Sequence, residues 1–100
     1  MSGIAVPDYE AVAADVTAQV LGAGGRGDLL SHITIIPAAA SGVGSVTIID
    51  GSTSIVVFAG GDLSSAMPFT VALLMHAKEG PWKVTTGPNV SAIVVGNFQQ

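Results

Sequence analysis

Histidines are the first side chains to consider for chemistry in this sequence, because imidazole serves both as an acid–base group and as a metal ligand. His32 and His76 could bind a metal ion together with Asp28, Asp62 or Glu79. The two histidines show neither His-x-His nor His-x-x-x-His spacing. We therefore expect histidines at a surface or an interface, and no metal site.

Carboxylates and serines could support acid–base or nucleophilic catalysis. Acid–base catalysis needs Asp50, Asp62 or Glu79 brought into one cleft, but the two aspartates stand where turns are expected, which aspartate favours. No serine lies in a Gly-x-Ser-x-Gly nucleophile elbow. The sequence predicts no catalytic site, and we expect no enzymatic activity.

The glycine-rich stretch Gly22–Gly27 matches the G-x-G-x-x-G pattern of dinucleotide-binding sites. Such a site needs the pattern to open a helix whose N-terminus receives the pyrophosphate. Here the stretch leads into Asp28, whose carboxylate repels phosphate, and then into an alternating strand pattern. We interpret it as a turn and predict no cofactor. Arg26-Gly27-Asp28 also spells an integrin-type tripeptide, which we attribute to chance.

Trp82 is the only tryptophan, and it stands beside a Gly80-Pro81 turn. A carbohydrate-binding platform needs several exposed aromatic side chains, whereas the rest of the chain offers one tyrosine and three phenylalanines. A tryptophan at the start of a strand can instead bury a large apolar area. We expect Trp82 to anchor the core.

Composition excludes several classes of partner. The chain has 49% hydrophobic and only 10% charged residues, against a usual charged share of about 25%. Three basic residues against seven acidic ones cannot form the clustered positive surface that nucleic acid requires. No cationic membrane-surface helix and no membrane-spanning apolar run is apparent. We expect neither nucleic acid nor a membrane as a partner, and so few charges indicate that part of the surface contacts protein.

The clearest structural signal is a hairpin over Ser45–Phe58, in which two runs rich in β-branched residues flank Asp50-Gly51. Asp-Gly is typical of tight hairpin turns, because glycine adopts positive φ readily. A two-residue loop at Asp50-Gly51 or a four-residue loop from Asp50 to Thr53 gives the same side-chain faces. One face carries Val46, Ile48, Ile55 and Val57, and the other carries Thr47, Ile49, Ser54, Val56 and Phe58.

Further strands are predicted on both sides of this hairpin. Residues 17–21 favour a strand, although a helix from Asp8 to Gly22 is an alternative. In residues 29–36 the pattern places Leu29, Ile33 and Ile35 on one face and His32 and Thr34 on the other. Additional strands are predicted from residue 69 onward, with Phe69, Val71, Leu73, Met75 and Ala77 on one face, and at 82–86 and 90–98.

These strands and turns predict an all-β fold. Seven to eight short strands with turn signals between them are typical of a two-sheet antiparallel sandwich, and we expect jelly-roll or Greek-key topology. We expect residues 1–15 to form a loose N-terminal arm and residues 16–100 to form the β-sandwich domain.

Several strands are apolar on both faces, whereas the outer face of an antiparallel sandwich is usually polar. Scattered exposed apolar residues are one explanation. We favour a contiguous patch that packs on other subunits, and we expect the isolated chain to form a dimer or trimer. The candidate protein-contact residues are Ile49, Val56, Phe58, Leu74, Ile93 and Val95.

Eight segments together resemble a group of small proteins encoded among the structural genes of tailed bacteriophages. The segments are Gln19–Gly22, Gly27–Leu30, Ile35–Ala38, Ile49–Gly51, Val57–Gly61, Pro68-Phe69, Trp82–Ser91 and Val95–Phe98. They consist of turn and core residues, so no functional residue can be carried over from the group.

The resemblance implies a virion structural protein. Its implied role is that of a capsid decoration (cement) protein, made in the bacterial host cytoplasm, which binds the exterior of the shell and clamps neighbouring major capsid subunits. A tail, neck or head-fibre-base component is an alternative. A soluble β-sandwich that binds a ligand or carbohydrate is a second alternative.

Overall fold

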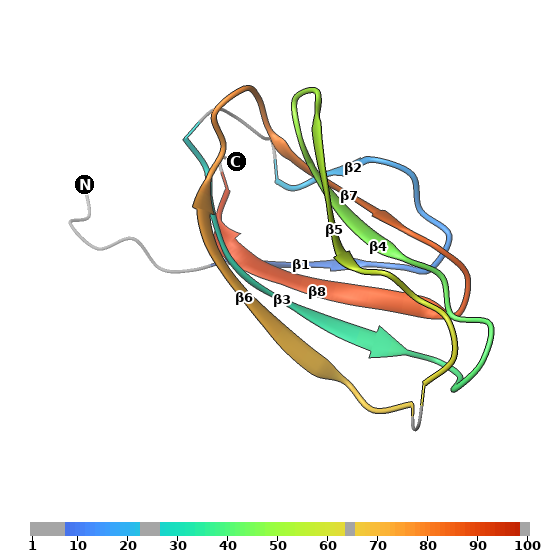
Figure 1. Cartoon of the computed structure of the whole chain (residues 1–100). Helices are drawn as coiled ribbons and strands as arrows, with labels where there is room; N and C mark the ends of the chain where they lie inside the picture. The colour runs from blue at the N-terminus through green and yellow to red at the C-terminus, as the bar shows by residue number, and fades with distance from the viewer. Residues whose placement is uncertain (1–7, 23–26, 64–65, 99–100) are drawn as a thin grey trace.

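Two four-stranded antiparallel sheets face each other in the computed structural model, which describes residues 8–22, 27–63 and 66–98 (Figure 1). The strand order is β1-β8-β3-β6 in one sheet and β2-β7-β4-β5 in the other. The strands are β1 (Asp8–Val12), β2 (Gln19–Val20), β3 (Leu29–Pro37), β4 (Val46–Asp50), β5 (Thr53–Phe58), β6 (Phe69–His76), β7 (Trp82–Thr86) and β8 (Val90–Asn97). This arrangement confirms the all-β sandwich and has the topology of a jelly roll.

The core lies between the two sheets and is built from alternate residues of β3, β4, β7 and β8, as their burial patterns show. Trp82 is 2% exposed, and its indole Nε1–H donates to the carbonyl oxygen of Asp28 at 3.0 Å. The expectation that Trp82 anchors the core is confirmed. Within the described residues, no helix is long and apolar enough to span a bilayer.

The hairpin of β4 and β5 closes on the pair Asp50↔Thr53, so its two-residue loop is Gly51-Ser52. This loop lies one residue later than an Asp50-Gly51 loop, because Asp50 pairs within the ladder. Gly51 has φ +59°, the positive value expected of the turn glycine. The shift leaves Ile48 and Ile55 on one face, as predicted, because they are direct partners. Ile55 is nevertheless 36% exposed, because β5 is an edge strand.

The N-terminal part of the described chain differs from the prediction. Asp8–Val12 forms β1, which pairs with β8 from Asp8↔Gly96 to Val12↔Ala92. The helix considered for residues 8–22 is therefore wrong, and the sheet begins well before the expected boundary at residue 16. The first seven residues of the predicted arm lie outside the described residues.

A bulge in the first sheet corrects the predicted face of β3. Leu30 pairs with Gly96 and His32 with Val95, so Ser31 has no partner on β8. The bulge changes the alternation, and Leu30 rather than Leu29 is buried in the core. Ile33 and Ile35 are buried as predicted.

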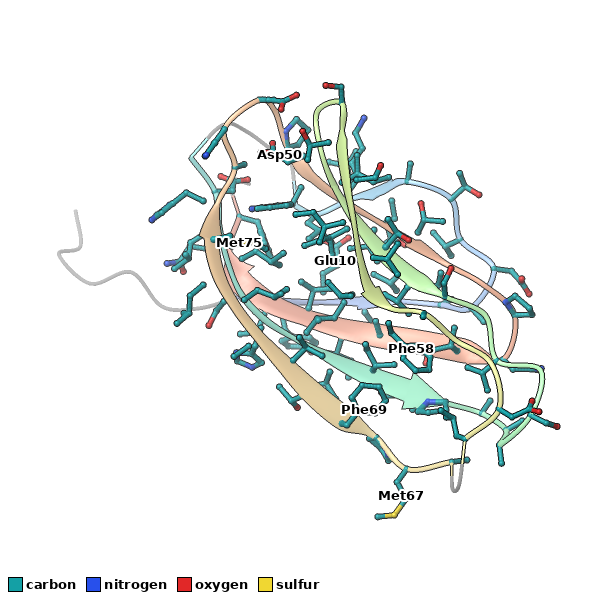
Figure 2. All side chains as sticks on the ribbon, viewed as in Figure 1. Glu10, Asp50, Phe58, Met67, Phe69 and Met75 are labelled. Atoms are coloured by element: carbon teal, nitrogen blue, oxygen red, sulfur yellow. The ribbon has the colours of Figure 1, made fainter. Side chains whose placement is uncertain are left out.

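The two long sides of the sandwich are closed differently. On the β1 side, the Glu10 carboxylate accepts hydrogen bonds from Gln19 Nε2 and Gly22 N–H, both at 2.7 Å, which links β1 to the segment around β2. On the opposite side, Phe58 of β5 and Phe69 of β6 meet edge to face with ring centroids 5.3 Å apart (Figure 2). Ile55 and Phe69 at this second side remain partly exposed, at 36% and 38%.

Candidate protein-interaction surface

The six predicted contact residues do not form one patch, because they are divided between the two sheets. Ile93 and Val95 of β8 and Leu74 of β6 belong to the first sheet. Ile49 of β4 and Val56 of β5 belong to the second. None of these five belongs to the buried core.

Phe58 has to be removed from the set. Val46 pairs with Phe58 and Thr47 with Val56, so Val57 is a bulge without a partner on β4. The bulge brings Phe58 to the same side as the buried Val46, and Phe58 packs against the core. The strict alternation assumed from the sequence placed Phe58 on the wrong face.

The outer face of the first sheet is continuous across all four strands. Backbone pairing aligns Tyr9, Val95, His32 and Ala72 in one row from β1 to β6. A second row consists of Ala11, Ile93, Thr34 and Thr70. With Ile36, Leu74 and Ser91, these residues form what we call the β8 face. It contains no aspartate, glutamate, lysine or arginine.

Three polar side chains of the β8 face, those of Thr34, Thr70 and His32, have a hydrogen-bonding neighbour close by. The hydroxyls of Thr34 and Thr70 are hydrogen-bonded to each other at 2.9 Å. His32 Nδ1 lies 3.2 Å from the hydroxyl of Ser31. Covering a polar group that already has a hydrogen bond costs less than covering one without a partner. These three side chains can therefore be covered by another protein at a low polar cost.

Tyr9 and Leu74 stand out most strongly from the β8 face, with exposed fractions of 75% and 71%. Leu74 has φ +51°, a left-handed backbone conformation that costs a non-glycine residue about 1–2 kcal/mol. It lies in a bulge, where Leu73 and Leu74 together oppose the single residue Ser31. A strained residue that presents an apolar side chain to solvent indicates a functional constraint.

The outer face of the second sheet is more polar. Its rows align Val20, Lys83, Ile49 and Ser54, followed by Thr85, Thr47 and Val56. Lys83 stands in the middle strand, so covering this face requires desolvation of its charge. The β8 face is therefore the stronger candidate for a protein interface.

Among the described residues, only two of the carboxylates considered for acid–base chemistry come together. They are Asp50 and Glu79, at the end of the sandwich where the β6–β7 loop lies. They line a groove of about 550 Å³ together with Thr53, Ile55, Met75, His76, Lys78 and Trp82. Asp50 accepts hydrogen bonds from the N–H groups of Lys78, Glu79 and Gly80 at 2.8–3.2 Å. Glu79 accepts from Ser52 and Thr53 at 2.8–2.9 Å. Both carboxylates therefore serve to hold loops together.

The two predicted histidines lie apart. His76 lines the groove with Asp50 and Glu79, and its Nδ1 lies 3.1 Å from the carbonyl oxygen of Gly27, whereas His32 lies on the β8 face. No group of three metal-ligating side chains is present among the residues that the structure covers. Residues 23–26, with most of the glycine-rich pattern and Arg26 of the tripeptide, lie outside those residues. The burial of Trp82 leaves no aromatic platform around it.

Comparison with known proteins adds no argument about the role of this chain. No protein-family model and no curated protein matches this chain. Among solved structures, PRD1 vertex protein P5 aligns with a TM-score of 0.47 and 14% sequence identity over 89% of this chain and 87% of that one. A similarity this low does not transfer a role from one protein to the other.

Proposed function

We propose that this chain is a structural protein of a bacteriophage virion, and specifically a capsid decoration protein that stabilises the shell. The observation that carries the proposal is the β8 face, a four-stranded surface without a charged side chain on a small protein. The resemblance of eight segments to products of phage structural genes supports the same role. The partners are the major capsid protein and further copies of the chain.

The size of the β8 face indicates how it would act. Four strands spaced about 4.8 Å apart, five to nine residues long at about 3.3 Å each, cover roughly 500 Å². A stable interface buries about 800 Å² on each partner. One face therefore makes a modest contact, and self-association strengthens attachment by allowing two faces to bind one shell.

The proposal places the protein on the capsid exterior after its synthesis in the host cytoplasm. It assigns the chain neither an enzymatic activity nor a cofactor, and the Asp50 and Glu79 carboxylates act in it as contacts that hold loops together. A location in the tail, neck or head-fibre base would use the same surface but a different symmetry. Imaging distinguishes these locations, because decoration follows the icosahedral sites of the shell.

Co-sedimentation of the purified chain with shells that lack it tests the proposal. Tyr9→Lys places a charge on the β8 face at a position that is exposed in the isolated molecule, so the fold is preserved. We expect this variant to lose shell binding. Val20→Lys adds the same charge to the outer face of the other sheet and should bind as the unmodified chain does. Failure of the unmodified chain to bind shells, or equal binding by Tyr9→Lys, would refute the proposal.

A further inference from the structure

The edge strand β5 has few of the features that usually prevent edge strands from pairing with other chains. Such features are charges, proline, bulges and short length. In β5 the sequence Thr53–Phe58 has no charged residue and no proline, and its bulge at Val57 leaves Thr53–Val56 regular. Half of the backbone groups of an edge strand point away from its one neighbour and are available for pairing.

The other three edges in the described part of the chain are each protected. The β1 edge carries Glu10, whose carboxylate is hydrogen-bonded to Gln19 and Gly22, and β2 is only two residues long. The β6 edge is interrupted by the bulge at Leu73 and Leu74. The contrast singles out β5 as the edge that is able to accept another strand.

The groove beside β5 is also incompletely closed. Met75 and Ile55 line it from the two opposing sheets. Phe69 and Met67 are also exposed, and Figure 2 shows Met67 at the end of the sandwich away from Asp50. A strand added to β5 would extend the second sheet past this opening. It would cover apolar side chains that the molecule itself leaves partly in solvent.

We infer that two copies of the chain pair through β5, antiparallel and about a two-fold axis, so that their second sheets join into one eight-stranded sheet. A two-fold axis perpendicular to the sheet brings both open sides together, so that each copy covers the other. A pairing of this kind is closed and stops at two subunits.

The distribution of charge favours a second copy in the antiparallel orientation. Glu79 is hydrogen-bonded to Thr53 and lies at the beginning of β5. Antiparallel pairing places the two copies of Glu79 at opposite ends of the strand pair, roughly 20 Å apart for six residues, which exceeds the Debye length of about 8 Å. Parallel pairing would bring the two carboxylates together. In the antiparallel pair, Val56 of one copy meets only uncharged residues of the other copy's β5.

Sedimentation velocity of the full chain at micromolar concentration tests this inference. Val56 is 61% exposed and lies in the middle of β5, so Val56→Lys leaves the monomer intact and brings two lysines together in the dimer. We expect a dimer for the unmodified chain and a monomer for Val56→Lys. Val20→Lys, which adds the same charge to the other edge strand of the same sheet, should remain dimeric.

Hydrogen exchange and shell binding complete the test. The β5 amides should exchange slowly in the unmodified chain and faster in Val56→Lys, while both keep the same far-ultraviolet circular dichroism. A monomeric unmodified chain, a trimer, or a Val56→Lys dimer would overturn the inference. The inference rests on the self-association part of the proposed function and not on shell binding. Tyr9→Lys should therefore remain dimeric, and Val56→Lys should still bind shells.

Discussion

Asp50 and Glu79 form reciprocal contacts between the β4–β5 hairpin and the β6–β7 loop. The Asp50 carboxylate, at the end of β4, accepts three N–H groups from the β6–β7 loop, and Glu79 of that loop accepts the N–H of Ser52 in the β4–β5 turn at 2.9 Å. Figure 2 shows Asp50 at this end of the sandwich. Because the β6–β7 loop connects the two sheets, this reciprocal pair fixes the hairpin to the connection between the sheets.

Replacing Asp50 with alanine should destabilise the protein strongly. Three backbone N–H groups would lose a charged acceptor, and hydrogen bonds to charged groups contribute about 1.5–3 kcal/mol each without being additive. We expect Asp50→Ala to lower the free energy of unfolding by about 2–3 kcal/mol in urea denaturation. Asp62→Ala is the control, since Asp62 is exposed and accepts one long hydrogen bond of 3.3 Å from Gly42. An equal loss in both variants would contradict the role of Asp50.

Stability should fall as the solution becomes acidic. Burial raises the pKa of Asp50, but the N–H groups of Lys78, Glu79 and Gly80, with the Lys78 charge, lower it more. The Ser52 N–H, followed by the hydroxyls of Thr53 and Ser52, lowers the pKa of Glu79.

A carboxylate with a depressed folded-state pKa stabilises the protein above its unfolded pKa, and that contribution disappears as pH falls through the folded value. We therefore expect the melting temperature to be highest above roughly pH 5 and to drop below roughly pH 4. In the double variant Asp50→Asn, Glu79→Gln this drop should be much smaller. An unchanged pH dependence in the double variant would show that other groups cause it.

Gly51→Val should disrupt the hairpin for two reasons. Gly51 has φ +59°, which a β-branched residue resists, and a side chain there would collide with Glu79. The conformational cost alone is about 1–2 kcal/mol. Gly80→Ala is a matched control in the facing loop, because Gly80 has no positive φ and its nearest neighbour, the Gly51 Cα, would be 4.0 Å away. Thermal melting should show a large loss for Gly51→Val and little for Gly80→Ala; equal melting temperatures would refute this turn assignment.

Leu74→Asn should separate stability from binding. Asparagine tolerates the left-handed conformation better than leucine, so relief of strain at φ +51° should raise the free energy of unfolding by up to about 1 kcal/mol. Loss of the apolar side chain from the β8 face should weaken shell binding in the co-sedimentation assay. A less stable variant would contradict the strain assigned to Leu74, and a variant that binds shells with undiminished affinity would remove Leu74 from the proposed interface.

Local sequence signals were sufficient for much of this fold. The Gly51 turn and the burial of Trp82 each depend on a few adjacent residues, and each is seen in the structure. β1 was missed because its five residues are stabilised by pairing with β8, which lies more than eighty residues away.

The candidate surface could be predicted only in part, because it depends on long-range pairing. The bulges at Ser31 and Val57 are defined by a neighbouring strand, and each changes which residue faces the core. Strand order decides whether two outward apolar residues share a sheet, so Val56 and Val95 were grouped from the sequence although they lie on different sheets. Pairing also brings Tyr9 and Val95 together, which no local pattern indicates.

Electron cryomicroscopy of shells incubated with the purified chain is the most direct test of the proposed role. We expect density for the chain at icosahedral sites on the shell exterior, with the β1-β8-β3-β6 sheet against the major capsid protein and Tyr9 and Leu74 in the contact. Shells without such density, or a chain seated with Lys83 and the other sheet against the shell, would contradict it.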